Sequence, residues 1–160
     1  MTYYDLPEKN LLAIKTLKDL KASGYATIGI KDELRKNLLR SFQEDKSVFE
    51  GIWGYEHTVI PDIERAILAR HNINFLGLRG QAKTRIARMM VLLLDEWIPV
   101  VQGSELNDDP LRPISHYALA KLKDEGDQMA IFWLHRNERY TEKLATPDVS
   151  IADLIGDVDP

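Results

Sequence analysis

The chain has 160 residues and a net charge of −4, with 44% hydrophobic and 29% charged residues, a balance typical of one soluble globular domain. No apolar run approaches the roughly 20 residues that a membrane span needs, and the first residues lack the pattern of a signal peptide. The absence of cysteine excludes disulfides and thiolate metal sites, which fits the cytoplasmic location that we expect. Acidic and basic residues are interspersed, so the charge does not favour nucleic acid as a partner.

Residues 1–48 predict a helical N-terminal extension. Residues 10–23 carry apolar side chains at helical spacing, and Gly24 is suited to end that helix. A second amphipathic helix follows, with Asp32 and Glu33 in its first turn. Its expected buried side consists of Leu34, Leu38, Leu39 and Phe42. Packing is a sufficient reason for both helices.

Residues 49–55 combine aromatic and apolar side chains with two glycines. This segment could press against an adenine ring or seal the core of the domain, and the residues alone leave both readings open. Thr58 is then suited to cap a helix and Pro61 to its first turn. We expect this helix to end near His71.

Residues 73–84 have the order of a phosphate-binding loop: strand, glycine loop, Lys-Thr and helix. The short apolar run from Ile73 to Leu78 is suited to a buried strand. Residues 85–97 then repeat apolar side chains at helical spacing, which predicts a helix. The alternative is a glycine-containing strand–helix turn with a solvated lysine, and the correct flanks on both sides favour nucleotide binding.

Each residue type in this loop has a chemical reason. Gly77 and Gly80 let the backbone turn tightly, so that successive N–H groups face an anionic phosphate. Lys83 supplies a positive charge to the phosphates of ATP, and the Thr84 hydroxyl is placed to bind Mg²⁺. Ala82 stands where the general pattern has glycine, and we expect its methyl group to fit because φ is negative there.

Strands and helices alternate from Ile73 onward, which predicts an α/β fold with a parallel or mixed sheet and helices on its faces. The remaining expected segments are a strand at 99–102, a polar loop at 103–110, a helix at 113–123, a strand at 129–134 and an irregular stretch at 141–160.

Two acidic segments imitate functional motifs. The run Val91–Glu96 looks like the second NTPase signature, but too few residues separate it from Thr84 for a crossover to a parallel strand. We therefore expect it to be helical, with Asp95 beyond reach of a metal at Thr84. The acidic cluster at 107–109 lacks the pattern of a calcium loop and is expected to be solvated surface, as are the scattered histidines.

No later strand ends in Asp-Glu, and no segment offers a water-orienting residue or an arginine finger. We therefore assign no catalytic residue within the 160 residues of the chain. We expect the chain to be the N-terminal portion of a longer NTPase.

The run Gly80–Thr84, preceded by Gly51–Tyr55 and a helix, resembles AAA+ ATPases of the magnesium-chelatase type, and MoxR-like AAA+ chaperones are a second reading. The resemblance covers residues 49–160. It implies a three-layer P-loop NTPase core of AAA+ type that assembles into a homo-oligomeric ring and uses ATP and Mg²⁺ to remodel a protein partner, which the sequence does not identify. The candidate nucleotide-binding residues are Gly77, Gly80, Gln81, Ala82, Lys83, Thr84, Arg85, Ile52, Trp53 and Tyr55, with Thr84 also as the metal ligand.

Two further readings remain open. A P-loop kinase or small GTPase is less favoured, because the chain has neither a guanine-binding Asn-Lys-x-Asp motif nor a lid of clustered arginines. A non-catalytic scaffold module is also possible, although intact Lys83 and Thr84 argue weakly against it.

Overall fold

The computed structural model describes residues 11–143 and 147–156. Their helices are α2 (Leu17–Ala22), α3 (Ile30–Gln43), α4 (Val59–Leu68), α5 (Lys83–Met89), α6 (His116–Glu125) and α7 (Ala152–Ile155). The strands are β1 (Trp97–Val101) and β2 (Ile131–His135), and short 3₁₀ helices occur at η2 (Met90–Leu93), η3 (Gly126–Gln128) and η4 (Arg136–Arg139).

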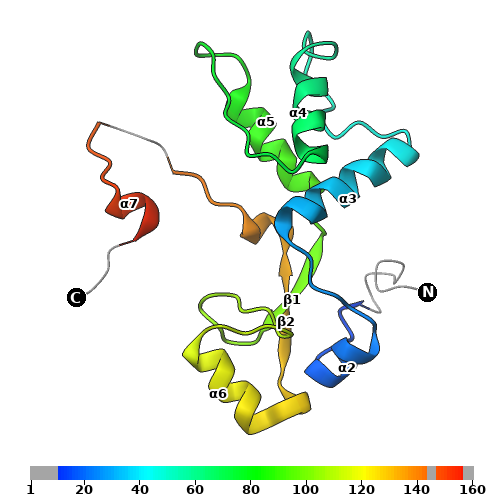
Figure 1. Cartoon of the computed structure of the whole chain (residues 1–160), viewed down its shortest axis with the longest axis vertical. Helices are drawn as coiled ribbons and strands as arrows, with labels where there is room; N and C mark the ends of the chain where they lie inside the picture. Colours follow the sequence, from blue (N-terminus) through cyan, green and yellow to red (C-terminus); the bar gives the residue numbers. More distant parts are fainter. Residues whose placement is uncertain (1–10, 144–146, 157–160) are drawn as a thin grey trace.

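Apart from η4 and α7, which follow β2 in the chain, the described elements form two groups (Figure 1). The helical lobe, residues 30–93, contains α3, α4, α5 and η2, whereas the sheet lobe, residues 11–28 and 96–135, contains α2, β1, α6 and β2. The chain therefore leaves the sheet lobe after α2 and returns to it at β1.

The helical lobe is built on one hydrophobic cluster. Its buried members come from α3, α4, α5, η2 and the segment between α3 and α4: Leu38, Phe49, Ile52, Ile60, Ile63, Ile67, Ile86 and Leu93. The apolar residues of α4 lie three and four positions apart and so share one face of the helix. Leu38 and Phe49 belong to the same cluster, so α3 packs with the residues that follow it.

The sheet lobe has two smaller clusters around an antiparallel strand pair. β1 and β2 pair with Trp97 opposite His135 and Val101 opposite Ile131. Leu20 of α2 packs on Ile131 and Trp133, while Leu17 packs with Val101 and Ala118 of α6. Thr16 caps α2 by accepting a hydrogen bond from the Asp19 N–H.

Several predicted elements are confirmed with shifted boundaries. Both helices of the N-terminal region, the helix after Thr58, the helix after Pro113 and the two strands near 99 and 131 are present. The first helix begins at Leu17 instead of residue 10, which lies outside the described residues. The stretch predicted to be irregular contains the short α7, and its remaining residues at 144–146 and 157–160 also lie outside the described part.

The predicted sheet differs from the structure. The two strands are antiparallel, not parallel or mixed. The segment Ile73–Leu78, predicted as a strand, forms no strand, because the backbone of no described residue pairs with it. A three-layer core is accordingly not shown by the described residues, and the AAA+ fold stays a prediction.

The helix after the loop is also shorter than predicted. It changes from α-helix to 3₁₀ helix at Met90 and ends at Leu93, where Leu94 becomes extended with φ −80° and ψ 150°. The Asp95 N–H then donates to the Glu33 side chain instead of continuing the helix. Trp97, Ile98, Val100 and Val101 are aromatic or β-branched, and pairing with β2 makes them a strand.

Candidate functional site

The loop between Ile73 and α5 contains two glycines with positive φ. Gly80 adopts φ +81° and Gly77 φ +156°, both within the region that L-residues with a side chain avoid. A β-carbon at Gly77 would also lie 2.1 Å from the side-chain oxygen of Gln81. The Gln81 side chain is exposed and can move away, so it is the conformation, φ +156°, that favours glycine at position 77.

Ala82 corrects one sequence-based expectation. Its φ is +54°, so it lies in the left-handed region and not at negative φ as predicted. This conformation costs a residue with a β-carbon about 1–2 kcal/mol, which is the physical reason why the general pattern has glycine at this position. The chain therefore adopts the loop geometry in spite of the alanine.

Lys83 is the first residue of α5 and turns back over the loop. Its ammonium group donates hydrogen bonds to the carbonyl oxygens of Gly77, at 2.9 Å, and of Leu78. These contacts hold one positive charge at the mouth of the turn formed by residues 77–82. An anion entering the turn would meet this charge together with the backbone N–H groups.

A cavity of about 410 Å³ opens beside the loop, between α4 and the start of α5. Its size suits a small organic ligand. Three of its residues are candidates from the sequence, Tyr55, Gln81 and Lys83. The others are Val59, Asp62, Ile63, Ala66, Ile73, Asn74, Phe75, Leu76 and Ile86. The lining is therefore mainly apolar, with Asp62, Asn74, Gln81 and Lys83 among its polar members.

The remaining candidates lie around this cavity without lining it. Ile52 is only 4% exposed and belongs to the core of the helical lobe, whereas Trp53 is 83% exposed. Of the segment expected near an adenine, the structure thus brings Tyr55 to the cavity. Arg85 lies beside Gly51, where a β-carbon would be 3.1 Å from its guanidinium group.

Thr84 lies next to Lys83 in the first turn of α5 and is exposed, so its hydroxyl is open to a ligand. Residues 11–143 and 147–156 bring together no group of three or more His, Asp or Glu side chains that could hold a metal. Thr84 would therefore supply one ligand to a metal that the phosphates of a nucleotide also bind.

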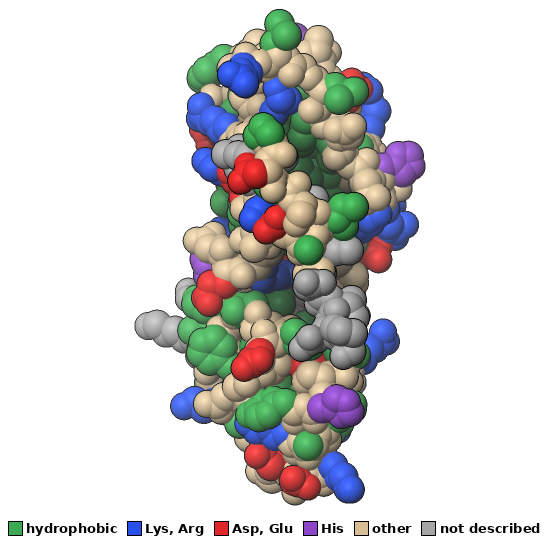
Figure 2. Space-filling model, turned by 90° about the vertical axis from the view of Figure 1, so that its left-hand side faces the viewer, with side chains coloured by type: hydrophobic (Ala, Val, Ile, Leu, Met, Phe, Trp, Pro, Cys, Tyr) green, Lys and Arg blue, Asp and Glu red, His purple; other side chains and the backbone are tan. Residues whose placement is uncertain are grey.

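The surroundings of the site are more basic than the rest of the chain. Residues 30–93 carry 11 Lys and Arg against 8 Asp and Glu, whereas the whole chain has 21 against 25. This excess of basic over acidic residues favours the approach of an anion to the helical lobe. Figure 2 shows one long face of the molecule, which is hollowed in its upper part.

A second cavity of about 390 Å³ lies near the same extended segment. Ile73 and Phe75 line both cavities, and the second one is otherwise mainly apolar, with Leu34, Ile67 and Met90. Backbone groups of residues 73–76 make no hydrogen bond with the backbone of any described residue. The segment is therefore unpaired among the described residues and has a cavity near each flank.

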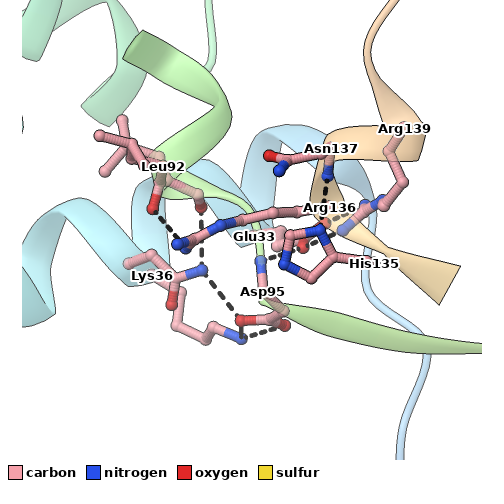
Figure 3. A network of polar contacts seen from close by, with 10 residues as sticks. Glu33, Lys36, Leu92, Asp95, His135, Arg136, Asn137 and Arg139 are labelled. Carbon is pink, nitrogen blue, oxygen red and sulfur yellow. Dashed lines mark hydrogen bonds and ion pairs between the residues drawn. The ribbon is translucent and has the colours of Figure 1, made fainter. Parts of the chain in front are cut away.

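Asp95 lies outside the loop site, as expected, but in a setting that the sequence did not indicate. Its carboxylate accepts hydrogen bonds from Lys36, at 2.7 and 2.8 Å, and from Asn37, at 2.9 Å (Figure 3). The neighbouring Glu33 forms two hydrogen bonds with Arg139, each 2.6 Å long. Burial lowers the pKa of Arg139, but the hydrogen bonds and charge of Glu33 more than offset this and raise it.

Asp108 also differs from the expectation, because it is buried and not solvated. It is 3% exposed and accepts hydrogen bonds from the Ser104 hydroxyl and from the N–H groups of Ile114, at 2.7 Å, and Ser115, at 2.9 Å. Burial raises the pKa of Asp108, but these hydrogen bonds outweigh burial and hold it well below its usual range. The role of Asp108 is to organise the loop before α6.

In the described part of the chain, none of the helices has the length and apolar character that a membrane crossing requires. Comparisons with models of protein families, with curated proteins and with solved structures find no match. The functional assignment therefore rests on the geometry of the loop and its cavity.

Proposed function

We propose that the chain is the ATP–Mg²⁺-binding part of an AAA+ ATPase of the magnesium-chelatase type. The observation that carries the proposal is the position of Lys83, whose ammonium group lies over a glycine turn at the mouth of a cavity of ligand size. In this proposal the turn at 77–82 and Lys83 hold the phosphates, Thr84 binds Mg²⁺, and Tyr55 lies on the side of the base.

The charges and donors present fit a polyphosphate. A phosphate needs several hydrogen-bond donors and positive charge, and the loop offers backbone N–H groups together with Lys83. The two carbonyl groups that Lys83 contacts are neutral acceptors. A doubly or triply charged phosphate would attract the ammonium group more strongly than they do.

The unpaired segment supports the AAA+ part of the proposal. An apolar stretch that makes no backbone hydrogen bonds with the described residues, and has a cavity near each flank, leaves backbone groups that neighbouring strands could pair with. The division into residues 1–48 and 49–160, the three-layer core, the ring and the protein partner belong to the same proposal. A MoxR-like chaperone or a non-catalytic scaffold would use the same loop.

The proposal separates the binding of ATP from its hydrolysis. Hydrolysis needs an acid that completes the metal site, a group that orients water and an arginine finger, and no residue here is assigned to these roles. The proposal therefore assigns ATPase activity only to an assembly that supplies these groups. The chain itself is proposed to bind ATP without hydrolysing it.

The test is calorimetric titration of the chain with ATP and Mg²⁺. Removing a charge-assisted contact should reduce the binding free energy by about 1.5–3 kcal/mol, so Lys83→Ala should weaken binding more than tenfold. Lys121→Ala is the matched control, because Lys121 also donates to a backbone carbonyl, that of Gln102 at 2.9 Å, but lies in the sheet lobe. Equal affinities of the parent chain and Lys83→Ala would refute the assignment.

A further inference from the structure

The two lobes share no hydrophobic cluster among the described residues. The cluster of the helical lobe extends from Leu34 to Leu93, and those of the sheet lobe use residues 11–25 and 97–133. The chain crosses between the lobes at residues 28–30 and again at 94–96. Apolar packing therefore stabilises each lobe, and a different interaction must fix their relative position.

A buried ion pair lies at this junction. Glu33, near the start of α3, is 3% exposed, and the Arg139 side chain, at the end of η4, is 12% exposed. Both guanidinium–carboxylate hydrogen bonds are 2.6 Å long, and the N–H of Asp95 donates to the same carboxylate at 2.6 Å. One carboxylate thus joins α3, the η2–β1 connection and η4.

Neighbouring contacts join α3 and η4 to η2 and to the η2–β1 connection. Asp95 accepts from Lys36 and Asn37 of α3, and Asn37 also donates to the Leu93 carbonyl at 2.9 Å. Arg136 of η4 donates to the Leu92 carbonyl at 3.3 Å. In Figure 3 these side chains converge on the point where the helical lobe meets the strands.

We propose that the Glu33–Arg139 pair, with Asp95 beside it, is a latch that holds the helical lobe and the sheet lobe in one relative position. Buried charges cannot exchange their partner for water without large free-energy changes, so the pair is closed or fully broken. A bidentate Arg–carboxylate contact fixes the relative orientation of the two side chains as well as the distance between them. The latch thus supplies the orientation that the separate hydrophobic clusters do not.

The packing beside the latch leaves room for it to open. A cavity of about 100 Å³ is lined by Glu33, Asp95 and Arg139 together with residues of β1 and of the segment before α3. This is space for a few water molecules next to polar groups. Water entering there can solvate the charges when the pair separates.

The test measures the distance between the lobes. The chain has no cysteine, so Ala69→Cys after α4 and Ala120→Cys in α6, both exposed, can carry a pair of spin labels. Double electron–electron resonance should give one narrow distance distribution for this labelled chain. The distribution should broaden or shift in Glu33→Gln and in Arg139→Lys, which keeps the charge but loses the two-armed geometry.

The deciding variant is the double change Glu33→Gln with Arg139→Met, which leaves no buried charge without a partner. The latch predicts that it keeps its helical circular dichroism and has a broadened distribution. A narrow, unchanged distribution overturns the proposal, and so does loss of helical structure, since each lobe has its own core. Glu142→Gln is the control. It breaks the pair of Glu142 with Arg88, which is also bidentate but whose Arg88 side chain is 61% exposed. This change should leave the distance distribution unchanged.

Discussion

Lys83 and Ala82 show how one or two residues determine the properties of the loop. Lys83 places a positive charge over the glycine turn, where its ammonium group donates a hydrogen bond to the Gly77 carbonyl. Ala82, at φ +54°, holds the backbone in a conformation that alanine disfavours. The site therefore combines a favourable charge with a locally unfavourable backbone.

The strain at Ala82 predicts that Ala82→Gly stabilises the protein. Glycine removes the left-handed penalty of about 1–2 kcal/mol, while its greater freedom in the unfolded chain costs about 0.5–1 kcal/mol. We expect the free energy of unfolding in urea to rise by about 0.5–1 kcal/mol. Ala87→Gly, within α5, is the control and should lower it by about 1 kcal/mol. A loss of stability in both variants would contradict the claim that the backbone is strained at Ala82.

Asp108 predicts a dependence of stability on pH. Because its pKa is lowered in the folded protein, it stabilises the fold above the unfolded pKa of about 3.9, and this contribution is lost as the pH falls below that value. Asp108→Ala should reduce the free energy of unfolding at pH 7 by about 2–3 kcal/mol, since buried N–H groups lose their acceptor.

The unfolding free energies of the parent chain and Asp108→Asn, measured by urea titration from pH 7 to pH 2, separate the charge from the hydrogen bonds. The difference in unfolding free energy between the two proteins should become smaller as the pH falls. A difference that stays constant with pH would show that the charge of Asp108 does not contribute.

At the scale of elements, local patterns predicted helices better than the sheet. The amphipathic spacing in α3 and α4 is a property of neighbouring residues, so both helices could be predicted from the sequence. The glycine turn followed by a helix could be predicted for the same reason, whereas its role as a phosphate-binding loop stays a prediction. The Glu33–Arg139 pair joins residues 106 positions apart, and no local signal marks it. Ile73–Leu78 has the composition of a strand, but a strand also needs a neighbour.

Helix capping gives a matched test at this scale. Both Ser115 and Thr58 precede a helix, but only Ser115 accepts a hydrogen bond from the helix, from the Ala118 N–H at 3.1 Å. Thr58 was predicted to cap α4, and its side chain makes no such bond. We expect Ser115→Ala to lower the free energy of unfolding by about 1 kcal/mol and Thr58→Ala to change it by less than about 0.5 kcal/mol. Similar losses in both would contradict the assignment of the caps.

At the scale of the whole molecule, the proposed phosphate site lies within the helical lobe, whereas the proposed latch lies at the junction of the two lobes. The site lies at the N-terminal end of α5, and the latch lies beyond η2, where the chain returns to the sheet lobe (Figure 1). Binding of nucleotide and orientation of the lobes can therefore be measured separately. A failure of one proposal would leave the other standing.

The whole chain is predicted to bind ATP but to release negligible phosphate from it. An arginine finger alone contributes roughly 10³–10⁵ in rate in related systems, and none is assigned here. Phosphate release by the purified chain is the assay, with Lys83→Ala as the control for contaminating enzymes. Steady turnover near 1 s⁻¹ that this substitution abolishes would mean that the chain holds a complete catalytic site.

The most direct test of the central claim locates the ligand on the molecule. In ¹H–¹⁵N correlation spectra, titration with ATP and Mg²⁺ should shift the amide signals of Gly77, Gly80, Lys83 and Thr84 in a saturable manner, since phosphate oxygens accept hydrogen bonds from these N–H groups. Signals of α6 and β2 in the sheet lobe should stay in place, and in Lys83→Ala the loop signals should shift only at nucleotide concentrations more than about tenfold higher. Unchanged loop signals at saturating nucleotide, or shifts confined to the sheet lobe, would contradict the proposed function.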